Sequence, residues 1–224
     1  MSAAAELPGR VAVAREAGER PNGPLLVMLH GDGHQVDELL AFARRLLPVR
    51  ETIVPVGCWG TYVGAMDLSN YTWFHEVPGV DEPEPVSLGR SLLDVEQLVA
   101  AARGAGSAPV VLVGAGQGAT LALALTAVLA DVLAAVVAIG GRPALLPPGA
   151  VPDAVGGGPV PALWLAEPGQ HERARGSGAL AALAAVADVA VEPLPDGEPL
   201  GDAAVERVGG WLELTVASGR GDGR

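Results

Sequence analysis

The sequence contains no lysine and only one cysteine, and these absences narrow what the protein can do. All fourteen basic residues are arginine, against twenty-six aspartates and glutamates, which gives a formal net charge of −12. This negative charge, without any basic cluster, argues against nucleic acid or an anionic membrane as a partner. Because Cys58 stands alone, an internal disulfide and a multi-cysteine zinc site are both excluded.

The sequence also shows no pattern typical of a signal peptide or a transmembrane helix. The first twenty residues have no basic region followed by an apolar run, so we expect no signal peptide. The apolar stretch 119–138 is interrupted by Asp131, which argues against a transmembrane helix. These features favour a cytoplasmic protein.

Aromatic residues make up only 4% of the chain, and half of all residues are apolar, so the core is built mainly from small aliphatic side chains. Short β-branched runs alternate with helical patterns, which predicts an α/β fold with a mostly parallel sheet covered by helices on both faces. We expect one domain over residues 1–216 and a flexible tail over residues 217–224. The expected strands are Val11–Arg15, Pro24–Leu29, Thr52–Val56, Val110–Val113, Val132–Ile139, Val160–Ala166 and Val189–Glu192, and the expected helices are Val36–Leu47, Ser87–Arg103, Gln117–Ala130, Glu172–Ala187 and Ala203–Val216.

Two connections carry further expectations. The first two strands flank a polar turn that contains Gly and Pro, which predicts a β-hairpin. Residues 57–85 form a long irregular stretch that holds most of the aromatic residues. Loops of this length in a compact domain are usually functional or disordered, and this one is too aromatic to be simply disordered.

Three segments together resemble a known family. They are LLVMLHGDGHQVDELL at Leu25–Leu40, YTWF at Tyr71–Phe74 and VVLVGAGQGAT at Val110–Thr120. They are similar, in order and spacing, to the His-Gly oxyanion turn, the aromatic-Trp-Phe loop and the nucleophile elbow of the phospholipase/carboxylesterase branch of the α/β-hydrolases, which includes acyl-protein thioesterases. The resemblance covers nearly the whole chain and implies a three-layer α/β-hydrolase fold without a large cap domain.

The catalytic triad that the resemblance implies is absent. The family elbow reads G-x-S-x-G, and Gly116 stands in the serine position, where it cannot form an acyl-enzyme. The acid position falls on Gln170, or on Glu167 if the register slips, and the histidine position falls on Glu198. No histidine follows His171. We therefore expect that Ser–His–Asp hydrolysis is lost. Gly116 should also keep the positive φ of the elbow without the cost of about 1–3 kcal/mol that another residue pays.

Other groups can still do chemistry at this site. The resemblance implies backbone oxyanion donors at Asp32 and Gln117, which do not depend on a triad. We expect Asp32, His34 and His75 at the carboxyl edge of the sheet, where open α/β sheets bind ligands. Such groups suit acid–base chemistry on a small carbonyl compound: elimination, isomerisation or cyclisation. No cofactor is expected.

Each of these residues also has a structural interpretation. His30 is expected to be a structural hydrogen-bonding residue, and His34 can be an exposed loop residue. His75 can cap the aromatic packing, and His171, in the acid loop, can lie at the surface or line the pocket. Asp32 and Asp37 can stabilise the next helix N-terminus.

Trp73 and Phe74 line a pocket or anchor the long loop, and packing is the simpler interpretation. Asp32, His34 and His75 would suit zinc or iron, but their spacing does not select a metal over hydrogen bonding, so no metal is expected. Cys58 lacks an evident base and is not expected to act as a nucleophile.

Three functions remain open at this point. The first is a non-hydrolytic enzyme that uses Asp32, His34 and His75. The second is a catalytically inactive homologue that binds a small acyl ligand or a protein partner. The third is an esterase or thioesterase with an atypical site. The expected partner is a small molecule, and a homodimer is left open.

Overall fold

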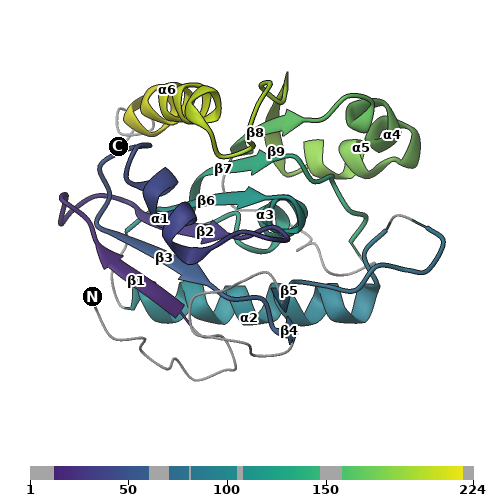
Figure 1. The fold of residues 1–224 in the computed structure, drawn as a ribbon, viewed down its shortest axis with the longest axis horizontal. Helices are drawn as coiled ribbons and strands as arrows, with labels where there is room; N and C mark the ends of the chain where they lie inside the picture. Colours follow the sequence, from purple (N-terminus) through teal and green to yellow (C-terminus); the bar gives the residue numbers. More distant parts are fainter. Residues whose placement is uncertain (1–12, 61–70, 81, 105–107, 147–157, 219–224) are drawn as a thin grey trace.

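The computed structural model describes residues 13–60, 71–80, 82–104, 108–146 and 158–218. A seven-stranded sheet forms its centre, with strand order β1-β3-β2-β6-β7-β8-β9 (Figure 1). Only β1 runs antiparallel to its neighbour, and all the other pairs are parallel. The strands are β1 (Val13–Ala17), β2 (Leu25–Leu29), β3 (Glu51–Pro55), β6 (Val110–Ala115), β7 (Leu133–Ile139), β8 (Val160–Ala166) and β9 (Ala187–Pro193).

Helices cover both faces of this sheet, which confirms the three-layer α/β-hydrolase fold. Successive side chains of a strand point to opposite faces, and the two hydrophobic cores separate accordingly. Leu25, Val27 and Leu29 pack with α2 (Pro85–Arg103), α3 (Gln117–Val128) and α5 (Ala179–Ala184). Leu26 and Met28 pack with α1 (Val36–Ala43) and α6 (Asp202–Ser218). No described helix is both long and apolar enough to cross a membrane.

The predicted hairpin between the first two strands is wrong. β1 pairs with β3, which lies between β1 and β2 in the sheet. The linker after β1 bonds to the residues before β3: the Gly18 N–H donates to the Arg50 carbonyl at 2.9 Å, and the Arg20 N–H donates to the Val49 carbonyl at 3.0 Å. These backbone bonds hold β1 at the sheet edge.

Three helix predictions also need correction. The helix expected over Val36–Leu47 ends at Ala43. The single helix expected over Glu172–Ala187 is two helices, α4 (Gln170–Ser177) and α5, because Gly178 between them adopts a left-handed conformation with φ +78°. The helix expected over Ser87–Arg103 begins two residues earlier, at Pro85, because the carboxylate of Glu84 caps it and accepts the N–H groups of Val86 and Ser87.

The long aromatic stretch holds a small sheet of its own. β4 (Trp59–Gly60) pairs antiparallel with β5 (Tyr71–Thr72), and residues 61–70 between them lie outside the described part of the chain. Of the expected tail, residues 217 and 218 belong to α6, and residues 219–224 are not among those described.

Candidate functional site

The turn between β6 and α3 has the geometry of a nucleophile elbow. β6 ends at Ala115, α3 begins at Gln117, and Gly116 between them has φ +53° and ψ −119°. No other residue type has a positive φ anywhere in the described chain. The structure therefore bears out the expected positive φ at Gly116, a conformation that glycine adopts without the usual penalty.

The three glycines of this turn serve different purposes. A Cβ on Gly114 would lie 2.1 Å from the Gly118 carbonyl oxygen, and a Cβ on Gly118 would lie 2.2 Å from the Leu29 carbonyl oxygen. Both flanking glycines are thus required by close backbone packing. At Gly116 the nearest atom to an added Cβ is the Cα of Gly31, at 3.4 Å, which is ordinary contact. The central position has room for a side chain.

His30 is a structural residue, as expected. Its ring is buried, Nε2 accepts the Gly57 N–H at 2.9 Å, and Nδ1 lies 3.1 Å from the Gly31 carbonyl oxygen. These two bonds fit a neutral ring with its proton on Nδ1. Burial lowers the pKa of His30 to about 4, although the bond to the Gly31 carbonyl favours the charged form. His30 is therefore neutral at physiological pH.

Trp73 joins the oxyanion turn to the elbow. Its indole N–H donates to the His30 carbonyl at 2.8 Å, and its backbone N–H donates to the Gln117 Oε1 at 3.1 Å. The hydroxyl of Ser91 on α2 donates to the Trp73 carbonyl. Trp73 and Phe74 are both buried in the core beside α2 and α3. They anchor the long loop, and they do not line the described cavities.

His34 lies beside the oxyanion turn, whereas Asp32 is exposed. The Gly31 N–H donates to the His34 Nδ1 at 3.0 Å, so the neutral ring carries its proton on Nε2. Because Gly31 also faces Gly116, the His34 imidazole is close to the elbow. The Asp32 side chain is exposed and makes no hydrogen bond or ion pair within the described part of the chain. The helix that follows is capped by Gln35.

His75 is bonded to the start of α2, and no described contact joins it to His34. Its backbone N–H donates to the Ser87 Oγ at 3.0 Å, and its carbonyl accepts the Glu84 N–H at 2.7 Å. Its exposed ring packs on Trp59, with ring centroids 5.0 Å apart. No contact between described residues joins it to Asp32 or His34. Over the same residues, no group of three or more His, Cys, Asp or Glu could hold a metal ion.

Cys58 is poorly suited to act as a nucleophile. The thiol is half-buried, and its Sγ lies 3.2 Å from the Ser91 Oγ. Burial is the main reason that the pKa of Cys58 is raised. A raised pKa leaves less thiolate, which is the reactive form.

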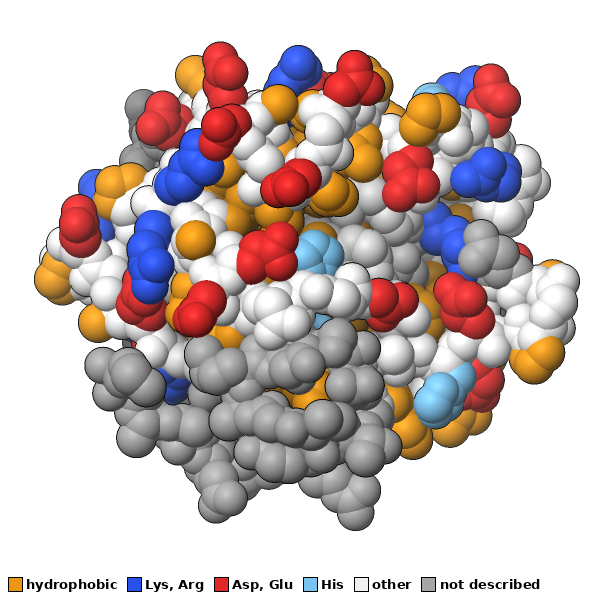
Figure 2. Space-filling model, viewed as in Figure 1, with side chains coloured by type: hydrophobic (Ala, Val, Ile, Leu, Met, Phe, Trp, Pro, Cys, Tyr) orange, Lys and Arg blue, Asp and Glu red, His pale blue; other side chains and the backbone are white. Residues whose placement is uncertain are grey.

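A cavity of 430 Å³ lies at the carboxyl edge of the sheet, between the loop before α2, the segment after β7 and the α4–α5 corner. Its charged and polar lining includes Arg142, Arg173, Glu82 and Gln170. Figure 2 shows a recess on the right of the view with basic side chains at its wall. The apolar part of the lining comes from Val80, Pro83, Pro85, Pro143, Ala144, Leu145, Ala174 and Ala179.

The comparisons with known proteins fit this geometry. The sequence profile of the phospholipase/carboxylesterase family matches residues 12–157, well over half of the chain. The chain belongs to this family. No curated protein matches the sequence.

Several solved structures are similar to this family member over nearly their whole length. The Bacillus cereus carboxylesterase has a TM-score of 0.69 at 17% identity and covers 93% of this chain and 96% of its own. The Mesorhizobium loti carboxylesterase has a TM-score of 0.65 at 19% identity, with 91% and 94% covered. The Zea mays acyl-protein thioesterase 2 has a TM-score of 0.65 at 16% identity, with 91% and 98% covered. At such identities these structures show the fold alone.

The two further positions that the resemblance implies for a triad, Gln170 and Glu198, both make local hydrogen bonds. The Gln170 Oε1 accepts the Glu167 N–H at 2.9 Å, and the Gln170 N–H donates to the Glu167 carbonyl at 3.1 Å. Both bonds hold Gln170 in the turn between β8 and α4. Glu198 is exposed, and its carbonyl accepts the Gly201 N–H at 2.9 Å. His171 is partly exposed, and its ring packs edge-on against Trp164, with the ring centroids 6.2 Å apart.

Sequence reasoning missed Arg142 and Arg173, the two basic residues of the cavity. A signal for them exists, since Arg142 follows Gly140 and Gly141 after β7, and Arg173 follows Gly169 after β8. Residues that follow parallel strands collect at the ligand-binding edge of an α/β sheet. The sequence favours the histidines instead, because imidazole is the commonest acid–base group in catalysis.

Proposed function

We propose that this family member binds a small acyl-containing ligand at the carboxyl edge of its sheet and does not hydrolyse it. The observation that carries the proposal is Gly116, which keeps the elbow backbone and supplies no nucleophile. Gln170 and Glu198 in the remaining triad positions, with no histidine after His171, support the same conclusion. Without a base, even a restored serine would not be activated.

The cavity supports a binding role. Its volume of 430 Å³ lies in the range of small-molecule sites, which are mostly apolar with a few polar groups that orient the ligand. Gln170 contributes to its lining, so the cavity adjoins the position where the family triad would have its acid. In this proposal the protein retains a ligand-binding cavity and lacks the groups for ester hydrolysis.

The first test is turnover of p-nitrophenyl acetate and of an acyl thioester by the unmodified protein and by a His34→Ala/His75→Ala double variant. We expect both proteins to show the same background rate as buffer. Native mass spectrometry of the purified protein should then reveal a bound small molecule. Turnover that disappears in the double variant would establish hydrolysis through an atypical site and overturn this proposal.

A second candidate function is proton transfer by His34 alone, because no contact between described residues joins it to Asp32 or His75, the other acid–base groups expected from the sequence. The observation that favours it is the bond from the Gly31 N–H to the His34 Nδ1, which fixes the ring beside the elbow with a proton on Nε2. His34→Gln would abolish such a reaction and leave ligand binding intact. Exchange of the α-hydrogen of a bound carbonyl compound with deuterated water, followed by NMR, is the direct measurement.

A further inference from the structure

We propose that the ligand is an unbranched fatty carboxylate, with its carboxylate held by Arg142 and Arg173 and its chain directed into an apolar slot between α3 and α5. This inference rests on the proposed binding function and names the chemistry of the ligand. Two adjoining cavities of opposite character carry it.

Basic residues outnumber acidic ones in the lining of the larger cavity, whereas acidic residues outnumber basic ones in the whole chain. Acidic residues exceed basic ones by twenty-six to fourteen in the sequence. The cavity has two arginines, Arg142 and Arg173, against the single carboxylate of Glu82. Arg142 also lies near the Glu76 carboxylate, which does not line the cavity, whereas no carboxylate partner is described for Arg173. An arginine also presents parallel N–H donors that fit a carboxylate bidentately.

Arg173 is folded back toward the cavity by the start of its helix. Its backbone N–H donates to the Gly169 carbonyl at 3.2 Å, and its Nη1 lies 3.2 Å from where a Cβ of Gly169 would be. Gly169 has φ +78° and no side chain, so it leaves the space that the guanidinium occupies. Gln170, the next residue, lines the same cavity.

Arg142 approaches the cavity from the segment after β7. Its backbone N–H donates to the Thr120 Oγ1 at 3.0 Å, which ties the start of this segment to α3. Its Nη2 lies 3.9 Å from the Glu76 Oε1, and the side chain is 27% exposed. A guanidinium has five N–H donors, so it can bind a carboxylate while it keeps other partners.

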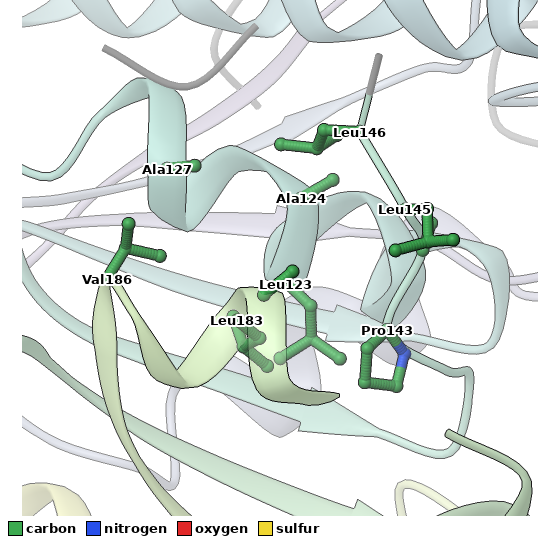
Figure 3. Close-up of a pocket in the computed structure, with 10 residues that line it drawn as sticks. Leu123, Ala124, Ala127, Pro143, Leu145, Leu146, Leu183 and Val186 are labelled. Atoms are coloured by element: carbon green, nitrogen blue, oxygen red, sulfur yellow. The ribbon is translucent and has the colours of Figure 1, made fainter. Parts of the chain in front are cut away.

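The apolar slot is lined by aliphatic side chains and by proline. Leu123, Ala124 and Ala127 of α3 form one wall, and Leu183 and Val186 form another (Figure 3). The segment 143–146 closes the remaining side. The slot has a volume of 90 Å³. An apolar cavity of about 150 Å³ can hold benzene, so this slot has room for the end of an alkyl chain.

The slot continues the larger cavity. Pro143, Ala144 and Leu145 line both. Along the opposite wall, Ser177 and Ala179 line the cavity, and Ala182 and Leu183 farther along the chain line the slot. A ligand that follows this wall therefore has its polar end near the arginines and its apolar end between α3 and α5.

The test measures binding of three eight-carbon probes by isothermal titration calorimetry: sodium octanoate, octan-1-ol and octylamine. We expect octanoate to bind at least about tenfold more tightly than octanol, because hydrogen bonds to charged groups are the stronger ones. Octylamine should bind most weakly. Arg173→Gln should weaken octanoate about tenfold and leave octanol unchanged, and the Arg142→Gln/Arg173→Gln double variant should bind the two equally. Arg175→Gln, on the same helix but outside the cavity lining, is the matched control.

The slot is tested by chain length. Each buried methylene should strengthen binding by about fourfold, so affinity should rise from butanoate to octanoate until the slot is filled. Ala182→Leu should remove this dependence, and Ala181→Leu, beside it on α5 but outside the lining, should not. Ala124→Leu provides a second variant from the opposite wall, with its melting temperature as the check on folding.

Each part of the inference can fail separately from the proposed function. Equal affinities for octanoate and octanol, or equal effects of Arg173→Gln and Arg175→Gln, would overturn the role of the arginines while ligand binding stands. A chain-length dependence that survives both leucine variants would overturn the slot. Absence of binding by all three probes at millimolar concentration would overturn the inference and count against the proposed function as well.

Discussion

The indole N–H of Trp73 donates to the backbone carbonyl of His30 at 2.8 Å, and the two rings lie with their centroids 4.9 Å apart. This pair connects the long aromatic loop to the oxyanion turn. Both residues are buried, with 1% of each exposed, so water cannot replace the bond if it is lost. The shape of the elbow region therefore depends on a tryptophan that is far from it in the sequence.

Trp73→Phe is expected to lower the free energy of unfolding by about 2–4 kcal/mol, since it leaves the buried His30 carbonyl without its donor and removes part of a packed ring. Urea denaturation measures the change. Trp59→Phe is the matched control, because the Trp59 Nε1 is buried without a hydrogen-bond partner in the described structure. That variant should cost less than about 1 kcal/mol, and an equal cost for both would show that the indole bond is unimportant.

His30 should make the protein less stable in mild acid. Its pKa is 6.5 in an unfolded chain and about 4 in the folded protein. Above pH 6.5 both states are neutral. Between pH 6.5 and 4 the unfolded chain binds a proton that the folded chain does not, so stability falls as the pH falls, by about 2 kcal/mol from pH 7 to pH 5.

The measurement is urea denaturation at pH 7 and pH 5, with His30→Gln and His171→Gln compared with the parent protein. His30→Gln should be less stable at pH 7 but should lose about 2 kcal/mol less between the two pH values. His171→Gln, at a partly exposed position, should keep the parent slope. An unchanged slope in His30→Gln would mean that His30 is not the titrating group.

The glycines of the elbow should differ in what they tolerate. Gly116→Ala adds a Cβ in ordinary contact with the Gly31 Cα at φ +53°, so the expected loss is about 1–3 kcal/mol of backbone strain. Gly118→Ala places a Cβ 2.2 Å from the Leu29 carbonyl oxygen and should cost more than about 3 kcal/mol. Thermal unfolding ranks the two, and the reverse order would contradict the assigned roles.

Gly116→Ser should fold and stay inactive. The space at position 116 accepts the side chain, but the Gln170 side chain accepts the Glu167 N–H and Glu198 is exposed, so we expect neither triad position to activate the hydroxyl. The assay is release of p-nitrophenol from short-chain esters, with Gly116→Ala as the control for background. Clear turnover by the serine variant alone would reveal a base that the described contacts do not show, and His34 would be the first residue to replace.

The sequence was sufficient for most of the fold because the signals involved are local. Alternation of apolar strands and helices predicted the parallel sheet, and the resemblance of Val110–Thr120 to the nucleophile elbow of the family predicted the turn at Gly116. The hairpin failed because the pairing of β1 with β3 is set by contacts between residues 18–20 and residues 49–50, which no local pattern contains. The break at Gly178 was missed because a single glycine within an otherwise helical pattern is often tolerated.

In the candidate site, too, the sequence predicts local features but not the contacts between distant residues. The sequence by itself determined which groups exist: glycine at position 116, and no histidine after His171. It also identified His30 as structural. Only the tertiary structure decided which side chains meet. It separated His75 from His34 by packing it against Trp59, and it brought Arg142, from the segment after β7, and Arg173, from α4, to one cavity. The reason is physical: a covalent sequence fixes which groups exist, whereas the packing of a sheet against its helices fixes which of them share a cavity.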